Sequence, residues 1–284
     1  MAIISEKDQA IINAYNTTVQ TGFAAGGPGS PLANVPLYRK VMADIDDNYI
    51  SPPNFVGAAV ASFQAERVLR PNLTAAVSVP KGAGPFPMLV HAHGHGLRAG
   101  HPKEYENWIR LMTSYGFVVI FPDYRLQPES TYEDQVDDMN FAIRWAKDNA
   151  RELKGNVDRM VIGGDSAGGR MAFDVMMRHL NDPAGARYRA FICVDGQMNG
   201  PEADAMLAKL TPQTPLPPIY IEAGSADVNA GLPCLRFAVK LMELRKDFQL
   251  DSSYGMPHDF IKMPQMDAAK ESNRRMMEFL KKAV

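Results

Sequence analysis

The sequence is poor in the features that mark several classes of protein. Its 284 residues include two cysteines, Cys193 and Cys234, and their spacing fits neither a zinc site nor a redox motif. A fold built on disulfides is therefore excluded, and both residues are expected to be buried, reduced thiols.

Long apolar runs and an excess of charge are also missing. No stretch approaches the roughly 20 apolar residues that span a membrane. After position 4 the first residues, MAIISEKDQAIINAYN, are polar, unlike a secretion signal. The formal net charge is −2, which gives no electrostatic basis for binding nucleic acid. We therefore expect a cytoplasmic enzyme or binding protein, with no nucleic-acid partner and no membrane span.

Alternating patterns dominate the rest of the chain. Helices are predicted at 3–20 and 37–50, on either side of a loop rich in glycine and proline. Two early strands follow, and from about residue 86 apolar runs alternate with helical periodicity. Strands are expected at 65–70, 74–80, 86–93, 117–124, 189–197, 218–228 and 248–254. A strand–turn–helix unit is expected at 159–180. Helices are expected at 103–116, 131–150, 233–246 and 269–284. This order predicts an α/β fold with a mostly parallel sheet covered by helices on both faces. Reactive groups are then expected at the carboxyl ends of the strands.

One glycine-rich turn has the form of a nucleophile site. GGDSAGG contains the pentapeptide Gly164-Asp165-Ser166-Ala167-Gly168, between the apolar run MVI and the helical pattern RMAFDVMMRHL. A serine in a tight strand-to-helix bend projects its oxygen, and small neighbours keep that bend free of collisions. The start of the helix also favours a developing negative charge. Ser166 is therefore the predicted nucleophile; the alternative is a glycine-rich helix cap without chemistry.

A serine hydroxyl needs a base, and the base needs a group that orients it. His258 lies in YGMPHDF, a loop that directly follows the last predicted strand. Asp227 directly follows the strand PIYIEAG, so the chain order is serine, aspartate, histidine. We predict Asp227 as the acid. Three other carboxylates are weaker candidates: Asp251, Asp259 and Glu222.

The stretch HAHGHGLRAG, at 91–100, allows two interpretations. Its three histidines alternate, so on one strand face they could bind zinc. The stretch could instead be a loop whose N–H groups bind an oxyanion, or a plain structural turn. We favour the oxyanion loop, because Gly94 and Gly96 interrupt the extended geometry. His95 and Gly96 would then donate backbone N–H groups, together with Ala167. His93 would brace the loop, and His91 would belong to the core.

Four motifs together resemble the hormone-sensitive-lipase-type esterases of the α/β-hydrolase superfamily. HGHG resembles H-G-G-G, DYRLQPE resembles D-Y-R-L-A-P-E, GGDSAGG matches G-D-S-A-G-G, and GMPHDF matches G-x-x-H-x-F. The resemblance covers roughly residues 60–284. It implies an α/β-hydrolase fold, a Ser166–His258–Asp227 triad, and supporting roles for Asp165 and Glu129 outside the chemistry. No cofactor or metal is expected.

Three departures from the family pattern carry consequences. His95 stands where the family has glycine, so its side chain must point towards the acyl pocket or Asp165. AGSADV is one residue longer before its aspartate. Only about 20 residues separate VDGQ from LPP, a shortened lid insert. The site is therefore expected to be open, or closed by residues 1–55 or a neighbouring subunit.

These observations give one functional hypothesis. Residues 1–55 form an N-terminal helical cap, and residues 56–284 a catalytic domain with a short cap insert around 196–215. The protein is expected to hydrolyse small or medium carboxylic esters through an acyl-enzyme on Ser166. Its expected partners are a small-molecule ester and a second copy of the chain. The alternatives are a lactonase, carbon–carbon lyase or acyltransferase with the same triad, or a ligand-binding relative without catalysis.

Overall fold

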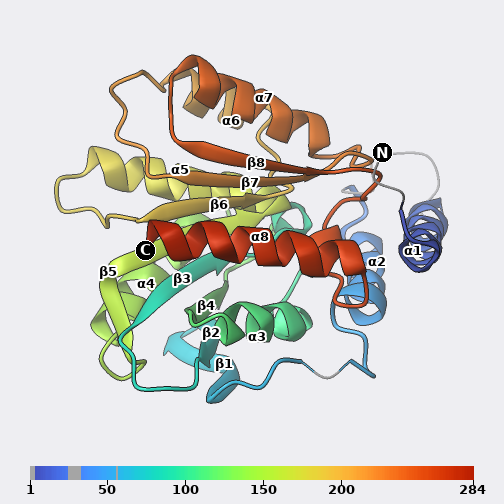
Figure 1. Cartoon of the computed structure of the whole chain (residues 1–284), viewed down its shortest axis with the longest axis horizontal. Coiled ribbons are helices and arrows are strands. Elements are labelled where there is room, and N and C mark those ends of the chain that lie inside the picture. Colours follow the sequence, from blue (N-terminus) through green and yellow to red (C-terminus); the bar gives the residue numbers. More distant parts are fainter. Residues whose placement is uncertain (1–3, 25–32, 56) are drawn as a thin grey trace.

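The computed structural model describes residues 4–24, 33–55 and 57–284 (Figure 1). One eight-stranded sheet runs through it in the order β1-β2-β4-β3-β5-β6-β7-β8. β1, β2 and β4 pair antiparallel, and every pair from β4 to β8 is parallel. The strands are β1 (Ser62–Arg70), β2 (Leu73–Val79), β3 (Phe86–Ala92), β4 (Val118–Asp123), β5 (Gly155–Asp165), β6 (Ala190–Val194), β7 (Ile219–Gly224) and β8 (Phe248–Ser253). The prediction of a mostly parallel sheet is confirmed.

Helices cover both faces of this sheet. Successive strand residues face opposite cores: Met88 and Val90 of β3 lie in one apolar cluster and Leu89 in the other. The first cluster includes side chains of α4 (Tyr132–Asp148), α5 (Ser166–Asn181) and α7 (Gly231–Glu243). The second includes side chains of α3 (Glu106–Ser114) and α8 (Asp267–Ala283), which lie in front of the sheet in Figure 1. This three-layer arrangement is the predicted α/β-hydrolase fold.

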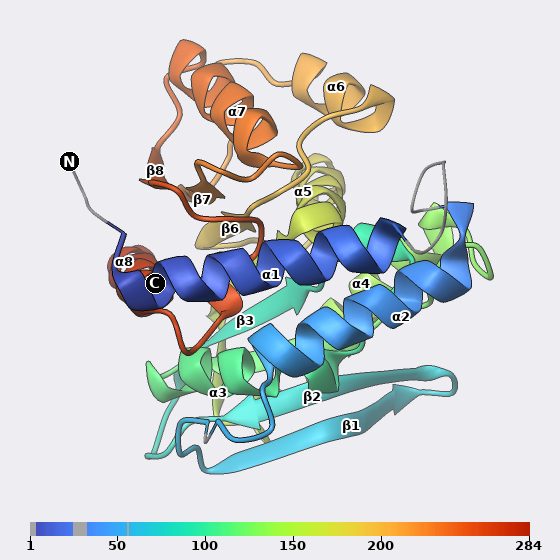
Figure 2. The ribbon, with the colours of Figure 1, turned by 90° about the vertical axis from the view of Figure 1, so that its right-hand side faces the viewer.

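Two N-terminal helices lie across the carboxyl ends of the strands. Figure 2 shows α1 (Glu6–Ala24) and α2 (Val35–Ile45) side by side in front of the sheet. Their apolar side chains, including Ile12 and Val41, pack into the second core cluster. No described helix is both long and apolar enough to cross a membrane.

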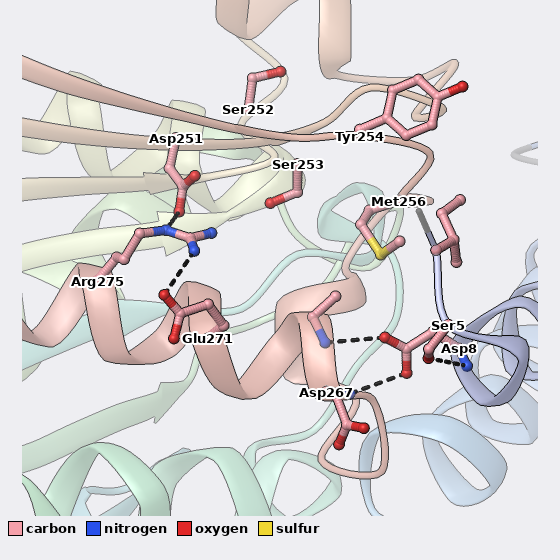
Figure 3. A pocket seen from close by; sticks show the side chains of 12 residues that line it. Ser5, Asp8, Asp251, Ser252, Ser253, Tyr254, Met256, Asp267, Glu271 and Arg275 are labelled. Carbon is pink, nitrogen blue, oxygen red and sulfur yellow. Dashed lines mark hydrogen bonds and ion pairs between the residues drawn. The ribbon is translucent and has the colours of Figure 1, made fainter. Parts of the chain in front are cut away.

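A buried carboxylate fastens α1 to α8. The side chain of Asp8 is 4% exposed and accepts hydrogen bonds from the N–H groups of Asp267 and Ala268, both at 3.0 Å. These N–H groups belong to the first turn of α8 and have no partner within that helix. Figure 3 shows this join at the edge of a cleft of about 540 Å³ between β8, α8 and the start of α1. A negative charge here also opposes the positive end of the α8 dipole.

An arginine fastens α2 to the loops below it. Arg39 forms a two-pronged pair with Glu129, at 2.7 and 2.9 Å, and donates to the carbonyl of Arg98 at 2.8 Å. Glu129 is exposed and does not touch Ser166 or its neighbours. The supporting role expected for Glu129 stays a prediction; its observed partner is Arg39 of α2.

Several predicted elements have different bounds. The helix predicted at 37–50 is α2 followed by a π-helical turn, η2 (Asp46–Ile50), which buries Asp46. The helix predicted at 103–116 begins instead with a 3₁₀ turn, η4 (Pro102–Tyr105). Nδ1 of His101 accepts from the N–H of Lys103 at 3.1 Å, and the carboxylate of Glu104 accepts from the N–H of His101 at 2.8 Å, so both side chains cap the turn.

One helix was missed altogether. α6 (Pro201–Ala208) is eight residues long; Gly200 is its N-cap and Pro201 is its first residue. So short a segment shows little helical periodicity in the sequence, and its flanking glycine and proline favour a loop.

We predict that Asp8→Ala weakens the attachment of α1. Two N–H groups of α8 lose their acceptor, so the free energy of unfolding should fall by about 1–2 kcal/mol. Urea denaturation measures this change, and hydrogen exchange of residues 6–24 shows whether α1 becomes less protected. Lys7→Ala, which removes an exposed ion pair with Asp267, is the control and should have a smaller effect. Equal effects of the two substitutions would contradict this role of Asp8.

Candidate active site

Ser166 lies at a strained bend between β5 and α5. Its φ is +50°, a left-handed conformation that residues with a side chain rarely adopt. Glycines on both sides make the bend feasible. A Cβ on Gly164 would overlap the backbone of Gly168, and one on Gly168 would overlap the carbonyl of His93. The bend therefore needs glycine at both positions, as the pentapeptide predicts.

The structure brings Ser166, His258 and Asp227 into one hydrogen-bonded chain. Nε2 of His258 is 2.9 Å from Oγ of Ser166, and Nδ1 is 2.8 Å from Oδ2 of Asp227. The other carboxylate oxygen of Asp227 accepts from the N–H groups of Asn229 and Ala230, at 2.7 and 3.0 Å. The aspartate is thus fixed by its own turn and orients the ring of His258.

The charges around His258 favour its protonated form. Burial lowers the pKa of His258, but the carboxylates of Asp259, Asp227 and Asp195 outweigh burial and raise the pKa to about 10. Burial raises the pKa of Asp227, yet the imidazole and two backbone N–H groups bring it below its usual value. Asp227 is therefore ionised at neutral pH and can stabilise a positive charge on the ring.

The three weaker carboxylate candidates lie elsewhere. Asp251 of β8 points toward α8, where it pairs with Arg275 at 2.8 Å (Figure 3). Glu222 is fully buried in β7, and burial raises its pKa well above the usual value, so it is neutral. Asp259 pairs with Lys262 at 2.9 Å, and its nearest approach to His258 is 3.8 Å, to Nε2.

A left-handed turn faces Ser166. His95, Gly96 and Leu97 have φ values of +57°, +61° and +61° in the short helix η3 (His95–Leu97). Successive residues of this kind direct their N–H groups into one concave space that suits an anion. In the described part of the chain, no hydrogen bond engages the N–H groups of His95, Gly96 or Ala167. Ala167 lies in the first turn of α5, where N–H groups have no helical partner.

The three alternating histidines have separate partners. His91 is buried in β3 and bonds Asp165 at 3.1 Å. His93 lies 3.1 Å from the hydroxyl of Tyr124, which also donates to the carbonyl of His93. His95 lies 3.2 Å from the hydroxyl of Tyr105. The imidazoles do not converge, so the geometry does not favour the zinc interpretation.

Two other groups of donor atoms lie within 4.8 Å of one another among the described residues. They are Asp46–His95–Glu104 and Asp195–His258–Asp259. Burial raises the pKa of Asp46 well above its usual value, which favours a neutral carboxyl over a metal ligand. Both ring nitrogens of His258 are already engaged. Neither group therefore offers a strong cation site.

Asp165 joins three parts of the site below Ser166. One carboxylate oxygen, Oδ2, accepts from the N–H of Gly94 at 2.9 Å and from Nζ of Lys262 at 2.6 Å. The other oxygen faces His91. Lys262 and Asp165 are both 0% exposed, so this is a fully buried ion pair. It ties the bend at Ser166 to the HGHG turn and to the loop of His258.

Sequence reasoning missed Lys262. The residue follows Phe260 and Ile261 and precedes Met263, all of which are buried. A lysine within a run of core residues is the signal that could have found it, because a buried lysine needs an anionic partner.

A cavity of about 250 Å³ opens above Ser166. Its upper wall comes from α1 and α2, and its floor from the turns that hold the reacting groups. The lining residues are Tyr15, Val19, Phe23, Tyr38, Met42 and Ile45 above, and His95, Ser166, Gln197, Asn229, His258 and Asp259 below. His95 also borders the cavity, but its ring nitrogens face the hydroxyl of Tyr105 at 3.2 Å and the carboxyl of Asp46 at 3.4 Å, and not Asp165.

We predict that Lys262→Met destabilises the fold. The substitution leaves the buried carboxylate of Asp165 without its cation, which should cost about 3–5 kcal/mol of unfolding free energy. In the Asp165→Asn/Lys262→Met double variant the loss should be smaller than the sum of the two single losses. Denaturant unfolding of all three variants measures the coupling. Lys270→Met, at an exposed lysine, is the control; strictly additive losses would contradict the ion pair.

Comparison with known proteins agrees with this geometry. Residues 89–194 match a family described by the alpha/beta hydrolase fold. Carboxylesterase NlhH of Mycobacterium tuberculosis is 36% identical over 88 residues, which are 31% of this chain and 28% of that protein. Human hormone-sensitive lipase is 32% identical over 92 residues, 32% of this chain and 9% of that protein. The matched segment thus spans less than a third of either relative.

Solved structures share the fold over nearly the whole chain. The hyperthermophilic esterase from the archaeon Pyrobaculum calidifontis superposes with a TM-score of 0.78 and 18% identity, covering 99% of both chains. A structure described as a bacterial heroin esterase gives 0.74 and 19%, covering 93% of this chain and 97% of the other. The chain therefore has the α/β-hydrolase fold, and its central segment is similar to the carboxylesterases and hormone-sensitive lipase.

Proposed function

We propose that the protein is a serine carboxylesterase that cleaves esters of small or medium acyl groups through an acyl-enzyme on Ser166. One observation carries the proposal: Ser166, His258 and Asp227 form a continuous hydrogen-bonded chain beside the unengaged N–H groups of the HGHG turn. The similarity to carboxylesterases over the central segment supports the same activity.

In the first step His258 takes the proton of Ser166 while Oγ attacks the ester carbonyl carbon. The carbonyl oxygen becomes negative and accepts from the N–H groups of His95, Gly96 and Ala167. Protonated His258 then gives its proton to the leaving alcohol, and the carbon–oxygen bond to that alcohol breaks. Asp227 stabilises the imidazolium while the negative charge exists.

Water releases the acyl group in the second step. His258 takes a proton from water as the water oxygen attacks the acyl carbon. The proton then passes to Oγ of Ser166, and the carboxylic acid departs. The bend at Ser166 projects its side chain out of the turn, and the hydrogen bond with Nε2 of His258 orients Oγ.

The N-terminal segment has a proposed role as a cap. Residues 1–55 contribute six of the side chains around the cavity, and Gln197 comes from the proposed insert at 196–215. Attachment of α1 through Asp8 and of α2 through Arg39 would keep this wall closed over the substrate.

Two further proposals come from the sequence. Association with a second copy stays a prediction, supported by exposed apolar side chains on α7: Leu232, Leu235, Val239 and Met242. A cytoplasmic location also stays a prediction.

We predict that Ser166→Ala removes esterase activity. Loss of the nucleophile should lower kcat for 4-nitrophenyl butyrate by about 10⁴-fold or more while the protein stays folded. A fluorophosphonate probe should label the parent protein at Ser166, as mass spectrometry of the peptides will show. Ser114→Ala, at an exposed serine of α3, is the control and should retain activity and labelling. Undiminished hydrolysis by Ser166→Ala would contradict the proposal.

The pH dependence should report the charges around His258. The base must be neutral, and its pKa is raised, so kcat/KM should increase as the pH rises towards about 10. Asp259→Asn removes one carboxylate that stabilises the imidazolium. The acidic limb of the profile should therefore move to lower pH, by about 1 to 3 pH units.

The pH profile and an NMR titration of the His258 ring both measure this shift. Asp158→Asn is the control, because Asp158 is exposed at the opposite end of β5. A limb that stays in place, or that moves to higher pH, would contradict the assignment of His258 as the base.

A further inference from the structure

The cavity above Ser166 contains polar side chains that the protein leaves unused. Tyr15 of α1 and Tyr38 of α2 line it, together with Gln197 and Asn229. Across residues 4–24, 33–55 and 57–284, neither tyrosine hydroxyl forms a hydrogen bond, and neither do the two side-chain amides. Both tyrosines are 8% exposed, but their hydroxyl oxygens are not fully buried and are accessible from the cavity that they line. A polar group that reaches the cavity can bond water or an oxygen of the substrate.

The two hydroxyl groups are suited to donate. Burial, with added repulsion from Asp259 and other nearby carboxylates, raises the pKa of Tyr15 and of Tyr38 above the usual value. Both therefore keep their protons at neutral pH. An oxygen atom of the substrate that enters the cavity can accept a hydrogen bond from them in place of water.

Shape and charge restrict that substrate further. A cavity of about 250 Å³ is smaller than the roughly 300–1,000 Å³ of sites for drug-sized ligands, so long acyl chains do not fit inside. The rings of Phe23 and Tyr38 lie 5.9 Å apart and nearly parallel, at 17°, on one wall. Such a wall suits a flat group. Among the described residues that line the cavity, none is lysine or arginine, whereas Asp259 is present.

We propose that the substrate is a compact, uncharged ester with a second oxygen function, such as an ether or ketone, which accepts hydrogen bonds from Tyr15 and Tyr38. This inference rests on the proposed esterase function and adds the class of ester. The two tyrosines then select the substrate, while Ser166 and His258 perform the reaction. Esters with a free carboxylate should be disfavoured, because no cation lies in the wall to neutralise them.

Matched esters test the inference. On the alcohol side, 4-methoxyphenyl acetate is compared with 4-ethylphenyl acetate. On the acyl side, 4-nitrophenyl methoxyacetate is compared with 4-nitrophenyl butyrate. In each pair an ether oxygen replaces a methylene group, and the ratio of the two kcat/KM values is the selectivity. Comparing this selectivity between variants cancels the intrinsic reactivity of the esters.

The variants are Tyr15→Phe and Tyr38→Phe. Each should lower the selectivity for the ether in at least one pair, by about 3- to 10-fold, the effect of losing one hydrogen bond. Tyr49→Phe is the matched control. Tyr49 packs edge-on against Tyr15, and its hydroxyl bonds Thr18 at 2.9 Å, but it does not line the cavity. Its selectivity should equal that of the parent protein.

The outcomes separate this inference from the proposed function. If Tyr15→Phe and Tyr38→Phe hydrolyse the esters with the same selectivity as Tyr49→Phe, the inference is overturned and the proposed function stands. Preference for 4-nitrophenyl hydrogen succinate over its methyl ester overturns the uncharged class. If the parent protein hydrolyses none of the esters and Ser166 resists the fluorophosphonate, the proposed function fails and the inference fails with it.

Discussion

The buried ion pair between Asp165 and Lys262 is the constraint on which the arrangement of the site depends. Asp165 immediately precedes Ser166, and its carboxylate also holds the N–H of Gly94 and the ring of His91. Lys262 lies four residues after His258 and reaches Asp165 at 2.6 Å. One carboxylate therefore fixes three segments that are far apart in the chain. The Asp165 carboxylate sets the distances between these three segments around Ser166, because a buried carboxylate needs all of its ion-pair and hydrogen-bond partners.

The contacts of Asp165 also stabilise two strained stretches of backbone in the site. The left-handed bend at Ser166 and the left-handed turn at His95 and Gly96 are unfavourable conformations, each costing about 1–2 kcal/mol per residue with a side chain. Neither conformation would persist in an isolated loop. The hydrogen bond from Gly94 to Asp165 joins them, so each supports the other. N–H groups held in this way need no reorganisation when negative charge develops.

The motifs of the sequence predicted the fold and the residues that meet at the site, because those residues occupy short, local patterns. Ser166 lies in a pentapeptide whose glycines have a steric purpose, and His258 and Asp227 follow strands whose ends meet. The partner of Lys262 and the role of Arg39 were beyond such reasoning. Each acts through a contact between segments that only the folded chain brings together.

Even less of the N-terminal segment could be predicted from local patterns in the sequence. Periodicity predicted its two helices but neither the π-helical turn at Asp46 nor the side chains that face the cavity. Residues of this wall share the cavity with Ser166, which lies more than 100 positions further along the sequence, so Tyr15 and Tyr38 look like ordinary helix residues in the sequence alone. The motifs therefore predict the reaction, whereas we propose that the wall above them selects the substrate.

The crystal structure of the protein after reaction with a small alkyl phosphonate tests the central claim most directly. The account predicts phosphorus bonded to Oγ of Ser166, with one phosphoryl oxygen about 2.7–3.1 Å from the N–H groups of His95, Gly96 and Ala167. A phosphonate bound to another residue, or an oxygen directed away from all three N–H groups, would contradict it.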